Sequence, residues 1–75
     1  MPGPPVLLYV KAGCAHCAAQ RAALAAQSAT VREIDIAARP ERIPELLKLT
    51  AGRRIVPVVV EGGRVTIAPH GGSSF

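Results

Sequence analysis

The residues with the clearest capacity for chemistry are Cys14 and Cys17, which enclose Ala15 and His16 in a C-x-x-C pattern. The pattern follows the unbroken apolar run Val6–Val10 and opens an alanine-rich stretch. This context predicts a cysteine pair at the junction of a strand and a helix. The unpaired N–H groups and the positive dipole end of a helix N-terminus favour a thiolate.

The two cysteines are expected to have different roles. Cys14 lies where the helix field is strongest, so its pKa should fall and it should act as the nucleophile. Cys17 lies one turn deeper and can reach the Cys14 sulfur, which suits it to resolve a mixed disulfide. His16 would stabilise the Cys14 thiolate as a cation or a donor, and Lys11 would hold an anionic substrate group. The alternative for both is an ordinary solvated side chain.

A C-x-x-C pair can also bind metal. Zinc sites use about four ligands, and this chain offers Cys14, Cys17 and either His16 or His70. A cysteine pair inside a strand–helix–strand pattern favours dithiol redox chemistry, so we expect no metal site within one chain. The rival hypothesis is a metal- or iron–sulfur-binding module that uses Cys14 and Cys17 either to hold a metal or to bridge a cluster between two subunits.

Length and composition exclude several classes of function. The 75 residues make a single domain, residues 1–75, with 49% hydrophobic residues and a net charge of +4. The basic residues are scattered and only 3% of the chain is aromatic, which disfavours nucleic-acid binding. Residues 1–5 lack the basic start of a signal peptide, and the apolar run is too short to span a membrane. We therefore expect a cytoplasmic protein, where a permanent disulfide is rare.

The elements expected around the cysteines form a βαβ unit. Strands are predicted at Val6–Val10 and at residues 31–36, with a helix from Cys14 to about Ser28 between them. A second helix should begin near Pro44, after a looser turn at Pro40, because proline favours the first turn. Its predicted buried stripe is Leu46, Leu47 and Leu49, and Gly52 is predicted at the C′ position.

The remaining pattern predicts a hairpin. Residues 55–60 read as a strand with Pro57 near its start, Gly62-Gly63 as the tight turn, and residues 64–67 as the returning strand. The stretch from Pro69 onward has no periodicity. The sum is an α/β fold of the order βαβ-α-ββ, with a four-stranded mixed sheet and a third helix truncated or absent.

Three motifs resemble the glutaredoxin family. They are Lys11-Ala-Gly-Cys14-Ala-His-Cys17, Val56-Pro57 before a strand, and Gly71-Gly72. In the family's order these motifs span nearly the whole chain. The resemblance implies a thioredoxin-like fold with Pro57 in the cis form, facing the cysteines.

The resemblance also implies a substrate site. Glutathione bound as in a glutaredoxin would meet Lys11, Arg53, the backbone of Val56 beside Pro57, and the stretch from Gly72 through Ser73 to Ser74. A solvated loop charge is the alternative for Arg53.

The chain departs from the family pattern at several positions. Ile55 stands where threonine is usual, and Ser74-Phe75 stands where the family has an acidic pair. The absence of proline and an aromatic residue between the cysteines is closer to short bacterial glutaredoxin-like redoxins, some of which carry selenocysteine at the first position. Weaker glutathione binding is expected, because the missing carboxylate would have met the glutathione amino group.

These observations predict a thiol–disulfide oxidoreductase that acts on protein or small-molecule disulfides through Cys14 and Cys17. It needs no bound cofactor, and either glutathione or a flavin disulfide reductase would return the electrons. Without a third helix, Val65 and Ile67 would leave an apolar patch. A monomer and a weak homodimer are therefore both compatible with the sequence.

Overall fold

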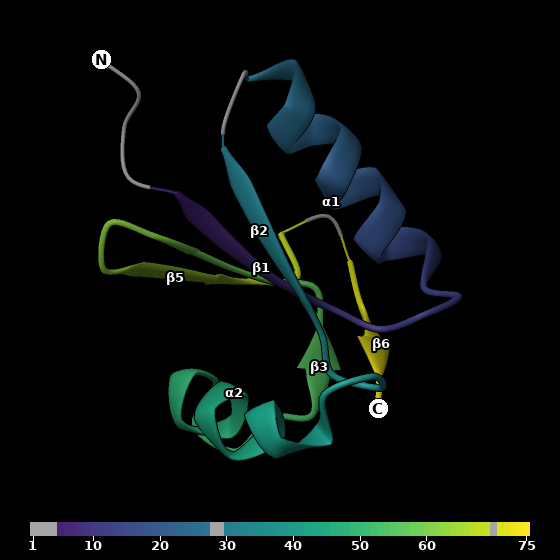
Figure 1. The fold of residues 1–75 in the computed structure, drawn as a ribbon, viewed down its shortest axis with the longest axis vertical. Helices are drawn as coiled ribbons and strands as arrows, with labels where there is room; N and C mark the ends of the chain where they lie inside the picture. The colour runs from purple at the N-terminus through teal and green to yellow at the C-terminus, as the bar shows by residue number, and fades with distance from the viewer. Residues whose placement is uncertain (1–4, 28–29, 70) are drawn as a thin grey trace.

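The computed structural model of the protein describes residues 5–27, 30–69 and 71–75. Its elements, in chain order, are β1 (Val6–Val10), α1 (Ala15–Ala26), β2 (Val31–Asp35), the 3-10 turn η1 (Pro40–Arg42), α2 (Ile43–Leu49), β3 (Ile55–Val56), β4 (Val58–Glu61), β5 (Arg64–Ile67) and β6 (Ser73–Ser74) (Figure 1). The predicted end of the first helix at Ser28, and His70, lie outside the described residues.

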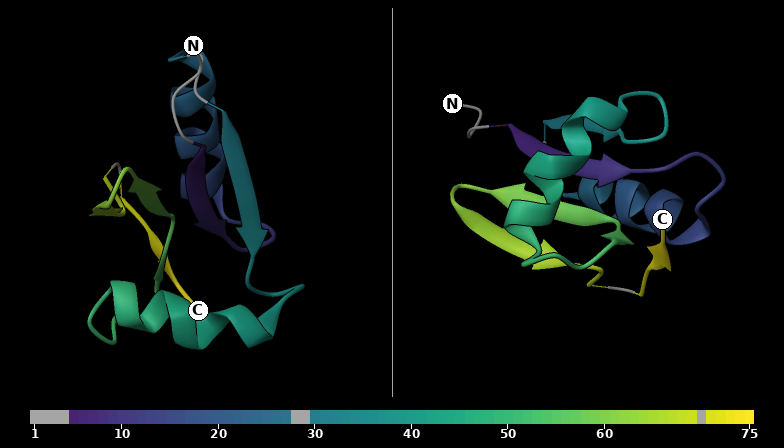
Figure 2. Two further views of the ribbon diagram at one scale, coloured as in Figure 1. Left: turned by 60° about the vertical axis from the view of Figure 1, so that its left-hand side comes forward. Right: turned by 90° about the horizontal axis from the view of Figure 1, so that it is seen from below.

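The central sheet has the strand order β2-β1-β4-β5. β1 pairs with β2 in parallel, whereas β4 pairs with both β1 and β5 in an antiparallel direction. α1 makes the crossover between the two parallel strands, and α1 and α2 cover opposite faces of the sheet (Figure 2). The α/β class, the four-stranded mixed sheet and the predicted order of elements are thereby confirmed.

The core is mostly aliphatic, although its largest fully buried side chain is that of Tyr9. Leu8 from β1, Leu46 from α2 and Val58 from β4 are fully buried. β1 is buried on both of its faces because Leu8 and Tyr9, which point to opposite sides of the sheet, are each at most 1% exposed. Both residues lie in the strand that leads into the cysteine pair, so the packed strand provides a rigid support for the loop before α1.

The second helix begins as predicted but ends differently. η1 starts at Pro40 and the regular helix follows from Ile43. The predicted C′ residue was Gly52, whereas Thr50 is the C-cap and Ala51 holds the C′ position with φ of 57°. Gly52 is one residue further and donates its N–H to the Leu47 carbonyl at 2.8 Å. Two successive residues with positive φ thus complete the turn that ends the helix.

The strand predicted over residues 55–60 is divided at Pro57. β3 precedes this proline and β4 follows it, and the two strands belong to different sheets. Proline has no N–H to donate to a ladder, which explains why regular pairing stops there. The peptide bond between Val56 and Pro57 is cis, the geometry that the family resemblance led us to expect.

The stretch after Pro69, expected to lack regular structure, contains a short strand. β6 pairs with β3 in an antiparallel direction, Ile55 opposite Ser74 and Val56 opposite Ser73. Its sequence has no strand pattern of its own, so the pairing depends on the edge that β3 offers. β6 runs beside β3 below the loop that leads into α1 (Figure 1).

The hairpin between β4 and β5 agrees with the sequence. Gly62 and Gly63 have φ of 55° and 85°, the signs that a type I′ turn requires at both positions. Val65 and Ile67 are half-buried and pack against the core. They lie opposite Val60 and Val58 in the β4–β5 ladder. In the part of the chain that the structure describes, neither helix has the length and hydropathy needed to cross a bilayer.

Candidate active site

Cys14 is the N-cap residue of α1, and Cys17 occupies the third helical position. The Cys14 sulfur accepts a hydrogen bond from the Cys17 N–H at 3.2 Å. Helix N-termini leave their first N–H groups without intrahelical partners, and an N-cap side chain usually supplies an oxygen to accept one of them. Here a sulfur does so. The local sequence therefore places a thiol where a negative charge gains from the helix end.

The surroundings of Cys14 favour its thiolate. Burial alone would raise the pKa of Cys14, but hydrogen bonds from the Cys17 thiol, the Ser73 hydroxyl, and the backbone N–H groups of Cys17 and His16 together lower it. The Cys14 Sγ and Ser73 Oγ atoms are 3.7 Å apart. These partners are neutral donors. They stabilise the negative charge when it forms and leave no unpaired charge beside the neutral thiol.

Cys17 differs from Cys14 in burial and in pKa. It is 1% exposed, and this burial is the main reason that its pKa rises to about 11. The hydrogen bond to Cys14 and the charge of the Cys14 thiolate raise the pKa of Cys17 further, while the backbone near Lys11 and the charge of Arg21 lower it. Both cysteines are free thiols. The pair therefore consists of one thiol prepared to ionise and one held neutral.

Four of the substrate-binding candidates lie along the β3–β6 contact, namely Lys11, Val56, Gly72 and Ser73. Val56 is buried and pairs with Ser73, and Lys11 donates from Nζ to the Ser74 carbonyl at 2.7 Å. Gly72 packs so closely that a Cβ atom there would lie 2.6 Å from the Val56 carbonyl oxygen. These residues are thus gathered around the 71–75 segment. Whether any of them binds a substrate stays a prediction.

Of the two adjacent arginines, Arg54 is the one that contacts this segment. Arg53 is exposed, and its carbonyl accepts from Thr50 Oγ1 at 2.7 Å. Arg54 instead donates from Nε to the Phe75 carbonyl at 2.9 Å, and its guanidinium lies 4.8 Å from the centre of the Phe75 ring. Sequence reasoning singled out Arg53, and its contact with a substrate stays a prediction. No signal in the local sequence indicated that its neighbour Arg54 would contact Phe75.

His16 is exposed, and its ring lies on the side of Gly71. A Cβ atom on that glycine would come within 3.1 Å of the ring atoms Cε1 and Nδ1. The His16 ring is not among the groups that lower the pKa of Cys14 in the part of the chain that the structure describes. What lowers the pKa of Cys14 at position 16 is the backbone N–H, a group that any residue except proline would supply.

An open depression of about 380 Å³ borders Cys14 on the α1 side. Its lining includes Lys11, Gly13, Arg21 and Asp35. Within residues 5–27, 30–69 and 71–75, the structure brings no three His, Cys, Asp or Glu side chains together at metal-binding distances. The charged side chains of the depression are thus two cations, Lys11 and Arg21, and one carboxylate, Asp35.

A comparison with protein families gives a match to the glutaredoxin model over residues 6–66. The chain belongs to the glutaredoxin family. Neither the curated proteins nor the solved structures contain a significant match to this chain. The matched range of this glutaredoxin includes Cys14, Cys17 and the cis peptide bond before Pro57, and it supports a glutaredoxin-like thioredoxin fold. The range ends before the 71–75 segment that contacts the nucleophile.

Ser73 shows what the sequence alone could not reveal about this glutaredoxin. The resemblance placed this residue among possible glutathione contacts, whereas its hydroxyl lies beside the Cys14 sulfur from 59 positions away in the chain. A serine in a run of glycine and serine carries no local mark of such a contact. Only the return of the chain along β3 brings it to the thiol.

Proposed function

We propose that this glutaredoxin-family protein is a thiol–disulfide oxidoreductase that reduces protein or small-molecule disulfides through Cys14 and Cys17. The observation that carries the proposal is the difference in pKa between the two thiols at one helix end. Cys14 has a lowered pKa, and the pKa of Cys17 is raised to about 11. Because of this difference in pKa, Cys14 is the cysteine that attacks the substrate, and Cys17 stays protonated until it resolves the mixed disulfide.

In the first step, the Cys14 thiolate attacks one sulfur of the substrate disulfide. A bond forms between the Cys14 sulfur and that substrate sulfur, the substrate S–S bond breaks, and the second substrate sulfur leaves as a thiolate. The Cys17 N–H and the Ser73 hydroxyl hold the nucleophile's charge before the attack. As the charge moves to the leaving sulfur, these donors are released.

In the second step, Cys17 attacks the Cys14 sulfur of the mixed disulfide. Two of the causes that raise the pKa of Cys17, its hydrogen bond to Cys14 and the charge there, disappear once Cys14 is bonded to substrate. Cys17 then ionises more readily and its proton passes to solvent or to the departing thiolate. The Cys14–Cys17 disulfide forms, the bond between Cys14 and the first substrate sulfur breaks, and that sulfur is released in its reduced form.

Return to the dithiol form needs two electrons from outside. Two glutathione molecules, becoming glutathione disulfide, or a flavin disulfide reductase would supply them, and a cytoplasmic location provides both in reduced form. The segment 72–75 bears on this choice, since Ser74-Phe75 offers no side-chain carboxylate to the glutathione amino group. Lys11 is also engaged by the Ser74 carbonyl. Both facts favour weak glutathione binding.

The function is tested by reducing the purified disulfide form with each electron source in turn, with a disulfide-bearing peptide as the final acceptor. Sustained turnover with either source, absent in Cys14→Ser, would support the proposal. Inactivity with glutathione and with a flavin disulfide reductase alike would overturn it. Titration of the oxidised protein with glutathione, followed by NMR, tests the weak binding. Saturable, tight binding centred on Lys11, Val56 and Gly72 would contradict it.

A further inference from the structure

The 71–75 segment occupies the edge of β3, beside the nucleophile. Phe75 donates its N–H to the Arg54 carbonyl at 3.3 Å, and the register places Ile55 opposite Ser74 and Val56 opposite Ser73. Hydrogen-bonded and non-hydrogen-bonded pairs alternate along an antiparallel ladder. The Val56–Ser73 pair is therefore the next hydrogen-bonded pair, and the main-chain groups of Val56 are engaged by the chain itself.

Side chains from other elements hold the same segment in place. Lys11, in the loop before Cys14, donates to the Ser74 carbonyl at 2.7 Å. Arg54 donates to the Phe75 carbonyl at 2.9 Å, and its guanidinium lies over the Phe75 ring. Both cations bind main-chain carbonyls, so the attachment depends on the path of the backbone more than on the side chains of the segment.

The segment also covers the thiol that must react. Cys14 is 7% exposed, and the Ser73 hydroxyl lies 3.7 Å from its sulfur. A disulfide must approach that sulfur in line with its own S–S bond. The edge of β3 is already paired with β6, so it is not free to pair with an extended substrate.

We propose that residues 71–75 form a strap that closes the active site, and that the strap must leave the β3 edge before Cys14 can attack a disulfide. The inference rests on the proposed function for its meaning, but its test uses thiol alkylation and needs no substrate. The ladder is short, because β3 and β6 have two residues each. The free energy needed to open a contact of this size is far lower than that needed to open the central sheet.

Gly72 provides a direct way to open the strap. A Cβ atom there would lie 2.6 Å from the Val56 carbonyl oxygen, 2.8 Å from the Ala68 Cβ and 2.9 Å from the Ile55 Cγ1. Because one of these neighbours is backbone, Gly72→Ala cannot be accommodated by a side-chain rotation. Ser73→Pro opens the strap in a second way, since proline has no N–H to give to the Val56 carbonyl.

Gly63→Ala is the matched control. Gly63 lies in the β4–β5 hairpin with a positive φ of 85°, and a Cβ atom there would meet nothing within 4 Å. The substitution introduces backbone strain of the kind that destabilises a glycine turn, but it leaves the strap untouched. It therefore separates opening of the strap from general loss of stability.

The experiment measures the alkylation rate of Cys14 by iodoacetamide against pH, in the full chain with Cys17 replaced by serine. At pH values where Cys14 is fully ionised, we expect Gly72→Ala and Ser73→Pro to raise the plateau rate at least about threefold, and Gly63→Ala to leave it unchanged. An unchanged plateau in both strap variants would overturn the proposal, because Cys14 would then be reached through the depression on the α1 side. An equal rise in Gly63→Ala would overturn it too.

Hydrogen exchange of the unmodified protein keeps the proposal testable if the variants fail to fold. The amides of Ser73 and Phe75 should exchange well before those of Val58 and Val59 in β4, through an opening that leaves the central sheet intact. Exchange of both groups in a single global event would show that the strap does not open by itself, and would contradict the proposal. Neither outcome depends on which disulfides the protein reduces.

Discussion

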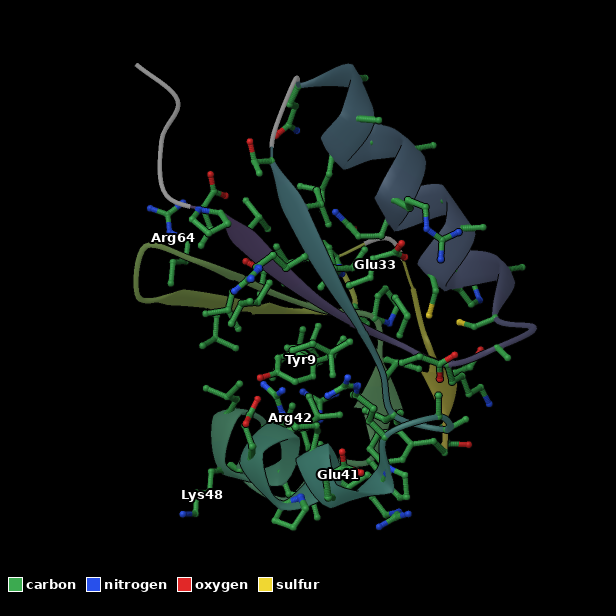
Figure 3. The ribbon with its side chains drawn as sticks, in the orientation of Figure 1. Tyr9, Glu33, Glu41, Arg42, Lys48 and Arg64 are labelled. Atoms are coloured by element: carbon green, nitrogen blue, oxygen red, sulfur yellow. The ribbon has the colours of Figure 1, made fainter. Side chains whose placement is uncertain are left out.

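The surroundings of Cys14 and those of Tyr9 are both hydrogen-bonded clusters that join distant parts of the chain, yet their charges arise in different ways. Around Cys14 the partners are N–H groups and hydroxyl or thiol groups, all neutral. Around Tyr9 they are the carboxylate of Glu45, to which the Tyr9 hydroxyl donates, and the guanidinium of Arg42, which pairs with that carboxylate. Figure 3 shows Arg42 next to Tyr9. The Cys14 cluster contains a charge only after the thiol ionises. The Tyr9 cluster contains the Arg42–Glu45 ion pair throughout the neutral pH range.

The Tyr9 cluster fastens α2 to the sheet. The Tyr9 hydroxyl donates to Glu45 Oε2, and Arg42 donates to both carboxylate oxygens of Glu45 at 3.0 and 2.9 Å. Burial, the hydrogen bond to Glu45 and the charge of that carboxylate raise the pKa of Tyr9 to about 12. The hydroxyl therefore keeps its proton over the whole neutral range. Such a cluster stabilises a fold and has no group ready for proton transfer.

The shifts in the pKa values of Cys14 and Tyr9 have opposite directions. At Cys14 the reactive, charged form is favoured, and at Tyr9 the neutral form is favoured. A substitution in the first cluster should change reactivity, and one in the second should change stability.

The largest expected effect is on the two cysteines themselves. Cys17→Ser should accumulate a mixed disulfide on Cys14 when mixed with a disulfide peptide, because the first step remains and the second is lost. Cys14→Ser should accumulate none. Mass spectrometry of the unreduced protein gives both results, and equal trapping by the two single variants would refute the assignment of roles.

Ser73→Ala should lower the alkylation rate of Cys14 near neutral pH about fivefold, in the background that lacks Cys17. The substitution removes a hydroxyl donor to the thiolate, and such a hydrogen bond is worth about 1 kcal/mol. The pKa of Cys14 therefore rises and less thiolate is present. Ser74→Ala is the matched control, because this exposed residue uses its backbone carbonyl to bind Lys11. Equal rates in the two variants would show that the Ser73 hydroxyl does not stabilise the Cys14 thiolate.

Tyr9→Phe should lower the free energy of unfolding by about 1 kcal/mol and leave the alkylation rate of Cys14 unchanged. It removes the hydroxyl that donates to Glu45 while the buried ring, 1% exposed, is kept. Denaturant unfolding and iodoacetamide kinetics measure the two quantities. A loss of thiol reactivity in a protein that is still folded would mean that the two clusters are coupled.

His16→Ala should change the Cys14 alkylation rate less than Ser73→Ala does, by under about twofold. The sequence suggested that the ring stabilises the thiolate, but the ring lies on the side of Gly71, and the backbone N–H that lowers the pKa of Cys14 survives the substitution. Alkylation rates measured side by side at one pH decide the matter. A decrease as large as that of Ser73→Ala would return the histidine ring to a role in activation.

The sequence predicted those parts of the fold that local patterns determine. The apolar run of β1, the alanine-rich helix after Cys14 and the Gly62-Gly63 turn each carry their own signal, so their type and order followed directly. β6 could not be predicted, because two serines have no strand pattern and pair only where β3 offers an unpaired edge. Ala51 at the C′ position was missed for a different reason: the glycine next to it is the usual residue at that position, and the local sequence favoured it.

The residues of the candidate site also differ in whether a local sequence pattern indicates them. Cys14 and Cys17 were found because their spacing and position before a helix are local features. The Ser73 hydroxyl and Arg54 were not recognised, because each acts through a contact with a residue far away in the chain. The same cause limits both the fold and the site, namely contacts that tertiary structure alone creates.

The most direct test of the account is the absorbance of the thiolate as a function of pH, measured for the reduced protein and for each single cysteine variant. The account predicts one thiolate that forms below the ordinary pKa of a cysteine and a second that forms near 11. The lower step should persist in Cys17→Ser and vanish in Cys14→Ser. Two steps at the ordinary value, or a lower step that survives in Cys14→Ser, would contradict the claim that Cys14 is the activated nucleophile.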